Sequence, residues 1–427
     1  MKVLIVGGGG REHAIALKIK ENPEVTALYA APGNGGIAQI ATCLPFKATD
    51  VDGIVRWAAE NKVDFVIVAP DDPLCLGMVD ALAAQGIPAF GPRKNAAIIE
   101  GSKVFSKNLM KKYGIPTAAY ETFDDYDAAV KYLQTADMPI VVKADGLALG
   151  KGVLICPDRE SAVEAVASMM KEAKFGASGA QVVIEEFLTG PEVSVLAFTD
   201  GKTVKPMVSS MDHKRALDHD EGLNTGGMGT IAPNPCYTPE LARRCMDEIF
   251  LPTIAAMNTE GRTFTGCLYF GLMMTPKGPK VIEYNCRFGD PETQVVLPLL
   301  KSDLLTIMRA TVDGTLADTP VEFASGAACC VVLASGGYPV SYKSGYPISG
   351  LDEAGKTATV FHAGTKLVDG QIVTAGGRVL GVTATADTLE AAIDKAYQAA
   401  DKITFTDMHM RRDIGQRALA SRKESHS

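Results

Sequence analysis

The first hundred residues alternate between short apolar runs and stretches with the spacing of amphipathic helices. Apolar runs at 2–6, 25–31 and 63–69 are each followed by a turn rich in Gly, Pro or Asp. Residues 11–22 and 78–84 place apolar side chains three or four positions apart, which predicts helices. Strands that alternate with helices form a parallel, doubly wound sheet. We therefore predict an α/β domain over residues 1–100.

The hydrophobic pattern changes in the rest of the chain. From residue 101 to about 325, helices and strands are mixed. The predicted helices are 102–113, 161–172 and 241–258, and the predicted strands are 139–143, 152–156, 182–187, 193–198, 266–274 and 280–285. From 326 short strands alternate with Gly turns, and a helix follows at 388–401. No low-complexity linker separates these regions, so we expect about three domains that pack closely.

Composition narrows the class of protein. The 427 residues include 42 Lys and Arg against 50 Asp and Glu, a net charge of −8, so we expect no nucleic-acid partner. Nine Cys without a C-x-x-C pair are typical of a reduced, cytoplasmic protein. The start lacks a signal peptide and no apolar run is long enough to span a bilayer, so we expect no membrane partner.

A glycine turn follows the first predicted strand, but it does not fit a dinucleotide-binding motif. In G-x-G-x-x-G the third position would be Glu12 or His13, and the second strand ends in Ala30 and Ala31 rather than in an acid. The backbone N–H groups of 8–10 (Gly8, Gly9 and Gly10), with Arg11 beside them, still suit a phosphate or carboxylate of a substrate. The alternative is a tight strand–helix turn that needs small residues.

A second Gly-rich loop, KADGLALGKGV, lies between two predicted strands. It contains Lys143, Gly146, Gly150, Lys151 and Gly152, and it lacks the Ser or Thr of a P-loop. We interpret it as a flexible loop that closes over a triphosphate. A Gly-rich β-turn with solvated lysines is the alternative.

The segment IEEFLTGPE offers groups for the nucleoside part of a nucleotide. Its strand end can present main-chain groups to an adenine edge, and a carboxylate further along can hold ribose hydroxyls. The residues concerned are Glu185, Glu186, Phe187 and Leu188, and then Glu192. An acidic strand end on the surface is the alternative.

The most specific segment is VIEYNCRFGDPETQ. Side chains alternate along a strand, so Glu283 and Asn285 share one face. Two oxygen ligands on a rigid strand suit Mg²⁺ when phosphates and water complete its coordination. Arg287 follows, where it can stabilise a transferring phosphoryl group, and Asp290 and Glu292 lie close by. A surface strand with a salt bridge explains this cluster less well.

Two polar loops complete the candidate site. SSMDHKR contains Asp212, His213 and Lys214, and His213 is either a general base or a structural or substrate-positioning histidine. LNTGGMGT supplies small and polar residues for close approach of backbone to a ligand, namely Asn224, Thr225, Gly226 and Gly227.

Together these motifs resemble the glycinamide ribonucleotide synthetase family of the ATP-grasp superfamily. The resemblance covers essentially the whole chain, through GGREHA, APGN, EGSK, KADGLALGKGV, IEEFL, DHKR, NTGGMG, IEYNCRFGDPETQ, HAGT, GGRVL and RRDIG. It implies an ATP-grasp fold with an N-terminal domain at 1–100, a central domain at 101–120 and 190–325, a flap at 121–189 and a C-terminal domain at 326–427. Two departures are APDDPL where the family has G-P-E-x-P-L, and Leu223 where a proline is common.

The resemblance also implies an activity: ATP-dependent ligation of glycine to 5-phosphoribosylamine through glycyl phosphate, with Mg²⁺ or Mn²⁺. It places Lys103 and Lys143 on ATP phosphates and Glu283 and Asn285 on the metal. The residues expected to act in the chemistry are Arg287, Asp212, Lys214 and Asp290, with Asp212 or Asp290 facing the glycine ammonium. The alternatives are another ATP-grasp ligase or carboxylase and a nucleotide-binding regulatory protein. We expect a monomer or weak homodimer.

Overall fold

A parallel sheet forms the N-terminal part of the computed structural model, which describes residues 1–148, 152–172 and 174–424. Its strand order is β3-β2-β1-β4-β5, with β1 (Lys2–Gly7) in the middle. Residues 3–6 of β1 are fully buried because helices cover both faces, as its unbroken apolar run predicts. The other elements are α1 (Gly10–Lys20), β2 (Ala27–Pro32), β3 (Thr42–Cys43), α2 (Val51–Glu60), β4 (Phe65–Val68), α3 (Asp71–Cys75), α4 (Met78–Ala84), β5 (Ala89–Phe90) and α5 (Lys94–Gly101).

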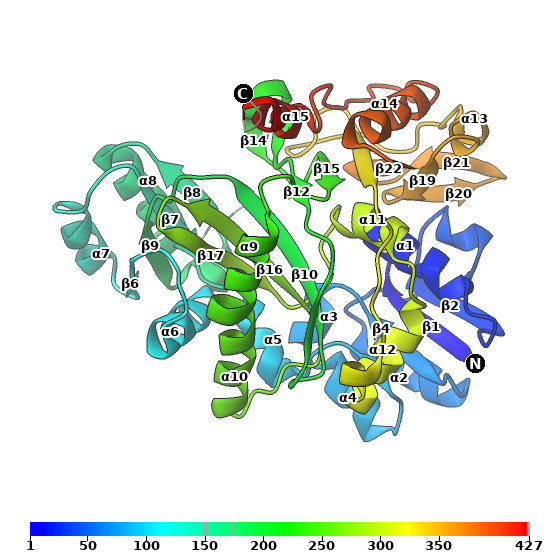
Figure 1. The fold of residues 1–427 in the computed structure, drawn as a ribbon, viewed down its shortest axis with the longest axis horizontal. Helices are drawn as coiled ribbons and strands as arrows, with labels where there is room; N and C mark the ends of the chain where they lie inside the picture. Colours follow the sequence, from blue (N-terminus) through cyan, green and yellow to red (C-terminus); the bar gives the residue numbers. More distant parts are fainter. Residues whose placement is uncertain (149–151, 173, 425–427) are drawn as a thin grey trace.

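The central region is built on an antiparallel sheet in the order β11-β10-β16-β17 (Figure 1). The predicted hairpin is present: β16 (Gly266–Thr275) turns into β17 (Gly278–Asn285). The predicted long helix is also present, as α9 (Pro239–Cys245), a π-helical turn (Met246–Phe250) and α10 (Leu251–Thr259). The remaining elements are α6 (Lys103–Tyr113), β10 (Glu192–Thr199), β11 (Val204–Pro206), α11 (Thr293–Val296) and α12 (Leu304–Asp313).

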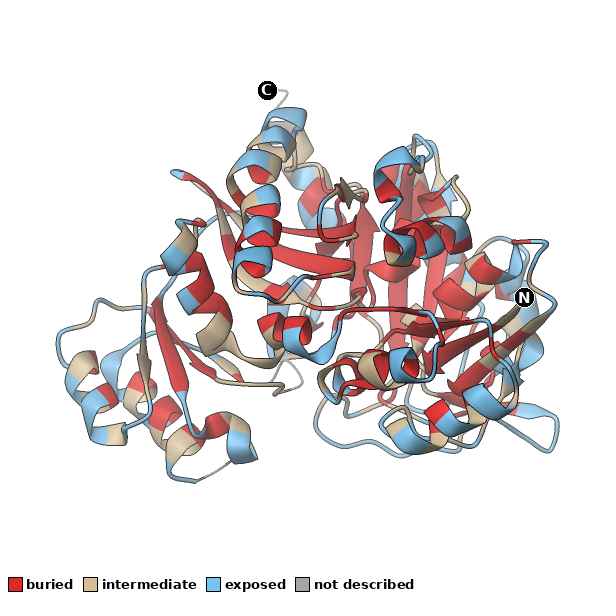
Figure 2. Ribbon diagram, turned by 90° about the horizontal axis from the view of Figure 1, so that it is seen from below, coloured by how far each residue is buried: buried red, intermediate tan, exposed pale blue. Residues whose placement is uncertain are grey.

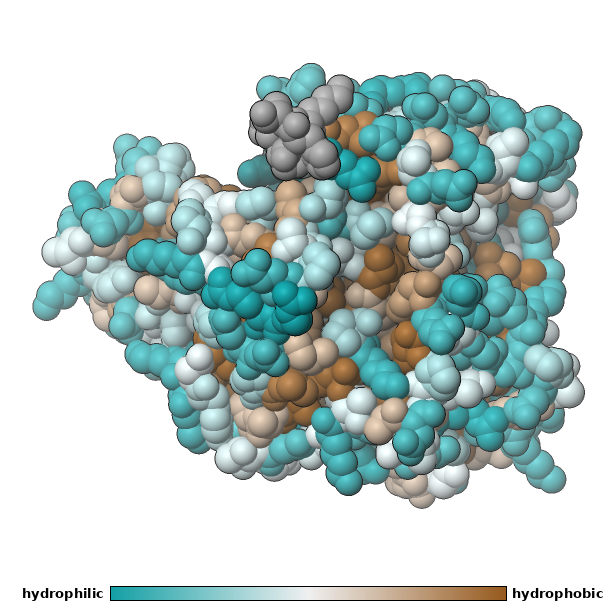
Figure 3. All heavy atoms as spheres, viewed as in Figure 1, coloured by the Kyte–Doolittle hydropathy of each residue, from teal (hydrophilic) through white to brown (hydrophobic). Residues whose placement is uncertain are grey.

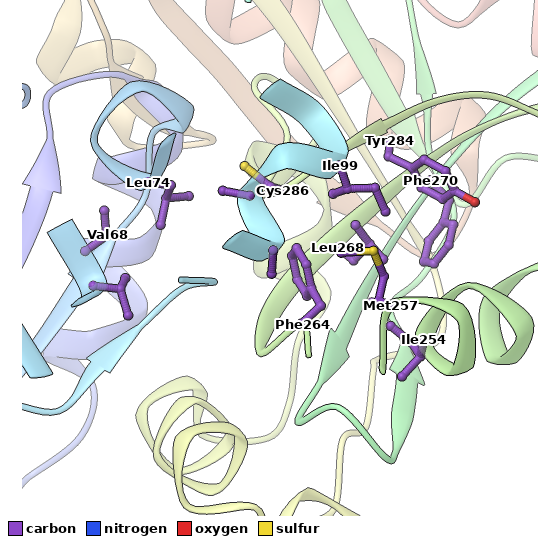
Figure 4. Close-up of a cluster of buried hydrophobic side chains, with 14 of the residues drawn as sticks. Val68, Leu74, Ile99, Ile254, Met257, Phe264, Leu268, Phe270, Tyr284 and Cys286 are labelled. Atoms are coloured by element: carbon purple, nitrogen blue, oxygen red, sulfur yellow. The ribbon is translucent and has the colours of Figure 1, made fainter. Parts of the chain in front are cut away.

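One hydrophobic core joins the N-terminal and central parts. Val68 and Leu74 of the first domain share it with Phe264, just before β16, and with Phe270 of β16. Figure 4 shows Cys286, which follows β17, between Leu74 and Ile99. The end of the strand with the candidate metal ligands is therefore packed against the first domain.

The flap is a four-stranded antiparallel sheet with its own core, projecting on the left in Figures 1 and 2. Figure 3 shows a notch in the surface between this arm and the C-terminal part. Two helices pack on one face of the sheet, whose strand order is β6-β9-β7-β8. Its elements are β6 (Tyr120–Phe123), α7 (Tyr126–Leu133), β7 (Ile140–Ala144), β8 (Val153–Cys156), α8 (Arg159–Met170) and β9 (Val182–Glu186).

The C-terminal sheet includes two strands from the central region. Its order is β12-β15-β18-β22-β19, and β12 (Met211–Asp212) and β15 (Gly229–Ala232) precede the predicted boundary at 325. The segment that carries Asp212, one of the candidate site residues, is thus anchored in this sheet. The other elements are β13 (Arg215–Leu217), β14 (Glu221–Asn224), β18 (Ala327–Ala334), α13 (Leu351–Gly355), β19 (Thr359–His362), β20 (Thr365–Val368), β21 (Gln371–Thr374), β22 (Arg378–Ala386), α14 (Leu389–Ala400) and α15 (Gln416–Glu424). No helix among the described residues is long and apolar enough to cross a membrane.

Candidate active site

A cavity of about 390 Å³ lies where the N-terminal domain, the central sheet, the flap and the C-terminal sheet meet. Its position agrees with the rule that ligands bind at the carboxyl ends of parallel strands. Most of the polar residues predicted from the sequence line it, together with several of the predicted glycines. They are Arg11, Lys103, Lys143, Gly146, Gly152, Asp212, Lys214, Asn224, Thr225, Gly226, Glu283, Asn285, Arg287, Asp290 and Glu292.

Three lysines line one side of this cavity, and a glutamate buried behind them pairs with two of the three. Lys143 and Lys107 both pair with the Glu185 carboxylate, Lys107 at 2.9 Å. Burial alone would raise the pKa of Glu185, but the two ammonium groups hold it below its usual value. Lys103 donates to the Gly146 carbonyl at 2.6 Å, and burial lowers its pKa. The sequence analysis did not single out Lys107, although it lies one helical turn after Lys103 on α6.

The Glu185 side chain has a structural role that the sequence did not indicate. Its side chain is buried between lysines, and neither it nor the following strand end lines the cavity. Glu186 pairs with Lys280, while Phe187 is exposed and Leu188 half-buried. Glu192 pairs with Lys214 at 3.2 Å. The proposed adenine and ribose contacts of Glu185–Leu188 and Glu192 stay predictions, and Gly150 and Lys151 lie outside the described residues.

Glu283 and Asn285 lie together at the cavity, as strand alternation predicts. Tyr284 between them points to the other side of the sheet, where its hydroxyl contacts Thr253 at 2.8 Å. The hydrogen-bond pattern places the Asn285 amide nitrogen 3.0 Å from Glu100, which leaves the amide oxygen available to a cation. No group of three or more His, Cys, Asp or Glu suitable for a metal occurs in the described chain. This oxygen pair fits a divalent ion whose remaining ligands are phosphates and water.

Arg287 is fixed by acids from the N-terminal half of the chain. Its Nη2 lies 3.2 Å from Glu100 and 4.0 Å from Asp71. Burial alone would lower the pKa of Arg287, but these carboxylates raise it, so the guanidinium stays charged. Glu100 also accepts from the Cys286 N–H at 2.7 Å, which ties it to the end of β17. Neither Glu100 nor Asp71 was assigned a role from the sequence.

Two acids, the half-buried Asp212 and the buried Glu292, face the opposite end of the cavity. Burial and the negative charge of Glu292 raise the pKa of Asp212 well above its usual value. Burial likewise raises the pKa of Glu292, which accepts from the Tyr269 hydroxyl at 3.1 Å. Lys214 lies 3.8 Å from Glu283, and Glu192 raises the pKa of Lys214. Acids that are costly to ionise are suited to bind a cationic group.

The glycine turn at the start of α1 binds a carboxylate of the protein itself. The Gly9 N–H donates to Glu12 at 2.8 Å. Glu12 thus uses one of the donors that the sequence analysis assigned to a substrate, in accordance with the positive end of the helix dipole. The Arg11 guanidinium also pairs with Glu12 at 2.8 Å. The role of Gly8, Gly9, Gly10 and Arg11 in binding a substrate phosphate or carboxylate stays a prediction.

Asp290 acts here as a structural anchor. It accepts from Gln294 at 2.8 Å and lies 3.5 Å from Arg378. Burial alone would raise the pKa of Asp290, but Arg378 and Arg11 hold this pKa below its ordinary value. Asp212, Asp290 and Glu292 all line the cavity, so which acid faces the glycine ammonium stays a prediction.

His213 does not line the cavity. Its Nδ1 lies 3.1 Å from the Gly229 carbonyl, and its Nε2 accepts from the Gly415 N–H at 3.1 Å. Burial, with Arg411 and Arg417 nearby, lowers its pKa to about 4. Nδ1 thus joins the residue after β12 to β15, and Nε2 joins it to the chain after α14. Of the roles weighed for His213, these contacts favour the structural one.

The NTGG loop lies beside the two acids. Asn224, Thr225 and Gly226 line the cavity, and Gly227 packs next to Asp212 with φ +118°, which favours glycine. Arg378, from the C-terminal sheet, also lines the cavity and was not predicted. It occurs in the GGRVL motif, yet nothing in its local pattern indicates which loop it reaches.

Comparisons with known proteins agree with this architecture. The family models for the phosphoribosylglycinamide synthetase N domain, ATP-grasp (A) domain and C domain match residues 1–100, 101–293 and 328–417. A protein of Halalkalibacterium halodurans named phosphoribosylamine–glycine ligase is 48% identical over 425 residues, covering 100% of this chain and 99% of its own. One of Rhodopirellula baltica with the same name is 49% identical over 428 residues, covering 98% of each chain.

Solved structures show the same fold. A phosphoribosylamine–glycine ligase of Thermotoga maritima superposes with a TM-score of 0.86 at 34% identity, covering 97% of this chain and 100% of that one. A biotin carboxylase of Campylobacter jejuni superposes with a TM-score of 0.75 at 15% identity, covering 96% and 92%, and shares the fold. Because all three family models match in order and the relatives align over their full lengths, the chain belongs to the phosphoribosylglycinamide synthetase family.

Proposed function

We propose that this protein joins glycine to 5-phosphoribosylamine with ATP, giving glycinamide ribonucleotide, ADP and phosphate through glycyl phosphate. One observation carries the proposal: a single cavity has lysines on one side, an oxygen ligand pair on a strand, and two acids that resist ionisation on the other side. The family membership supports the same reaction, since the relatives are named for it.

In the first step, a glycine carboxylate oxygen attacks the γ-phosphorus of ATP, and the bond to ADP breaks. The transferring group carries negative charge, which positioned cations neutralise. Lys103 and Lys143 supply this charge from the flap side, and Arg287 from the end of β17. Glu283 and Asn285 would hold Mg²⁺ or Mn²⁺, which when bound neutralises phosphate charge and orients its oxygens.

Glycine has to be held at both ends for this attack. Asp212 and Glu292 are the acids that face the cavity, and we assign the glycine ammonium to them. An ammonium between them favours their ionised forms, which offsets the cost of burying the carboxylates. Asp290 is left out because Gln294, Arg11 and Arg378 already surround its carboxylate.

In the second step, the amine of phosphoribosylamine attacks the glycyl carbonyl carbon. Phosphate leaves with the electron pair of the broken C–O bond, and the amine loses a proton. Water would hydrolyse the acyl phosphate, so the site has to be closed during turnover. We assign this closure to the flap at 121–189, which carries Lys143 and Gly146 at one wall of the cavity. The flap and the other predicted domain boundaries remain part of the proposal.

The proposal is tested by phosphate release and by product mass. Release is expected with glycine plus phosphoribosylamine, and not with bicarbonate or formate in place of glycine. Release with bicarbonate or formate alone would favour a carboxylase or another ligase, and no release with any acid would favour a regulatory protein. Sedimentation would test the predicted monomer or weak homodimer.

The metal assignment has its own test. Glu283→Ala is expected to abolish turnover and to weaken Mn²⁺ binding in the presence of ADP, measured by electron paramagnetic resonance. Glu248→Ala is the matched control, because Glu248 pairs with Arg244 at the surface of the π-helical turn. Normal Mn²⁺ binding by the Glu283 variant would refute the assignment.

A further inference from the structure

The guanidinium group of Arg378 connects the C-terminal sheet to two cavity loops. Arg378 begins β22 and lines the cavity. Its Nη1 donates to the Gly226 carbonyl at 2.8 Å and to the Asp290 carbonyl at 3.0 Å, and it lies 3.5 Å from the Asp290 carboxylate. The Asp290 carboxylate also lies against the start of α1 in the first domain, since an added Cβ atom on Gly9 would be 3.2 Å from it.

The Gly226 peptide is held from both sides. The Tyr338 hydroxyl, from the loop after β18, accepts from the Gly226 N–H at 2.9 Å. The Tyr338 ring packs on Gly377, where an added Cβ atom would lie 2.3 Å from the ring. A Cβ atom on Gly226 would lie 2.9 Å from the Arg378 guanidinium carbon. Glycine is therefore needed at both positions for this close approach.

The loop that these residues hold faces the acid end of the cavity. An added Cβ on Gly227 would lie 2.7 Å from an Asp212 oxygen, so the loop packs directly against that acid. Thr225 donates from its hydroxyl to the Lys214 carbonyl at 2.8 Å, which fixes the other side of the loop. Displacement of Gly226 would therefore move the wall beside Asp212.

The lysine end of the cavity is held independently of this contact. Lys103 donates to Gly146 of the flap, and Lys143 donates to the Ile282 carbonyl of the central sheet. Neither hydrogen bond involves the C-terminal sheet. Loss of Arg378 should therefore disturb one end of the cavity and leave the other in place.

We propose that Arg378 and Tyr338 are positioning residues for the glycine side of the reaction. They hold loop 224–227 in place beside Asp212, and they do not act on ATP. This inference rests on the proposed function, which assigns the glycine ammonium to Asp212 and Glu292, and adds the residues that order that end of the cavity.

The test is steady-state kinetics with glycine varied and with phosphoribosylamine formed from ribose 5-phosphate and ammonia. Arg378→Ala removes hydrogen bonds from a charged donor, so kcat/KM for glycine should fall by about tenfold to a hundredfold, with KM for ATP nearly unchanged. Tyr338→Phe removes one neutral hydrogen bond and should act in the same direction by about threefold to tenfold. Arg378→Lys should restore part of the loss, since lysine keeps the charge but not the planar fork.

Arg412→Ala is the matched control, because Arg412 pairs with Asp401 on the surface of the same domain. Thermal unfolding shows whether each variant is folded. If Arg378→Ala does not fold, the kinetics of Tyr338→Phe decide the test. Equal losses for ATP and glycine in Tyr338→Phe, or unchanged glycine kinetics in a folded Arg378→Ala, would overturn the inference. A wild-type protein that forms no product with glycine would instead refute the proposed function.

Discussion

Replacing His213 by Gln separates its structural role from catalysis. In the folded chain the neutral ring donates from Nδ1 to Gly229 and accepts at Nε2 from the Gly415 N–H. A proton added at Nε2 would set two N–H groups against each other, close to Arg411 and Arg417. The folded state therefore resists protonation, in agreement with the pKa of about 4.

The size of the effect on the free energy of unfolding follows from the difference in protonation of His213 between the folded and unfolded states. An unfolded histidine has a pKa of about 6.5, so at pH 5.5 it carries about 0.9 proton, while the folded ring carries almost none. Unfolding thus takes up about 0.9 proton at His213, which lowers the free energy of unfolding by about 1.4 kcal/mol at this pH. Because the folded pKa is lowered, this loss begins as the pH falls through about 6.5 and is complete near pH 4. At pH 8 the ring is neutral in both states and contributes nothing.

Calorimetry in buffers of different ionisation enthalpy measures this proton uptake directly. His213→Gln should take up about 0.9 proton fewer than the wild type at pH 5.5. His13 and His362, whose pKa values burial lowers to about 3 and about 4, contribute equally to both proteins and cancel. At pH 8 the two proteins should take up the same number of protons, which is the internal control.

Turnover distinguishes the two roles of His213. Gln can still accept from Gly415, so we expect the variant to keep most of its activity at pH 8. Equal proton uptake by both proteins at pH 5.5 would refute the linkage argument. A folded variant that binds ATP but has lost turnover would show that His213 is a catalytic base after all.

Two further predictions concern buried charges. Glu185→Gln leaves Lys107 and Lys143 facing each other without a carboxylate, so it should destabilise the fold by about 3 kcal/mol and raise KM for ATP, measured by urea unfolding and kinetics. Its control is Glu186→Gln, an exposed neighbour whose change should cost less than about 1 kcal/mol, and equal effects would refute the argument. Asp290→Asn removes the charge that holds Arg378 and should cost about 2 kcal/mol in urea unfolding; an unchanged midpoint would show that the contact does not stabilise the fold.

The sequence alone determined the features that depend on local pattern. Alternation along one strand placed Glu283 and Asn285 on the same face of β17, and the turn at 276–278 marked the hairpin that presents them. The apolar run at residues 2–6 marked the central strand of a parallel sheet, because a strand covered on both faces needs no polar positions. The motifs also identified the family, which the comparisons confirm.

Only the tertiary structure decided which of the candidate groups are free to meet a ligand. Asp290 and His213 have side chains typical of site residues, but both are bonded within the protein. Asp290 contacts Gln294 one helical turn away and the distant Arg378, and His213 accepts from the distant Gly415 N–H. Arg378 reaches the cavity from about 150 residues beyond Gly226, a distance over which sequence spacing carries no information. A side chain's chemistry is encoded locally, whereas its availability depends on what the folded chain places beside it.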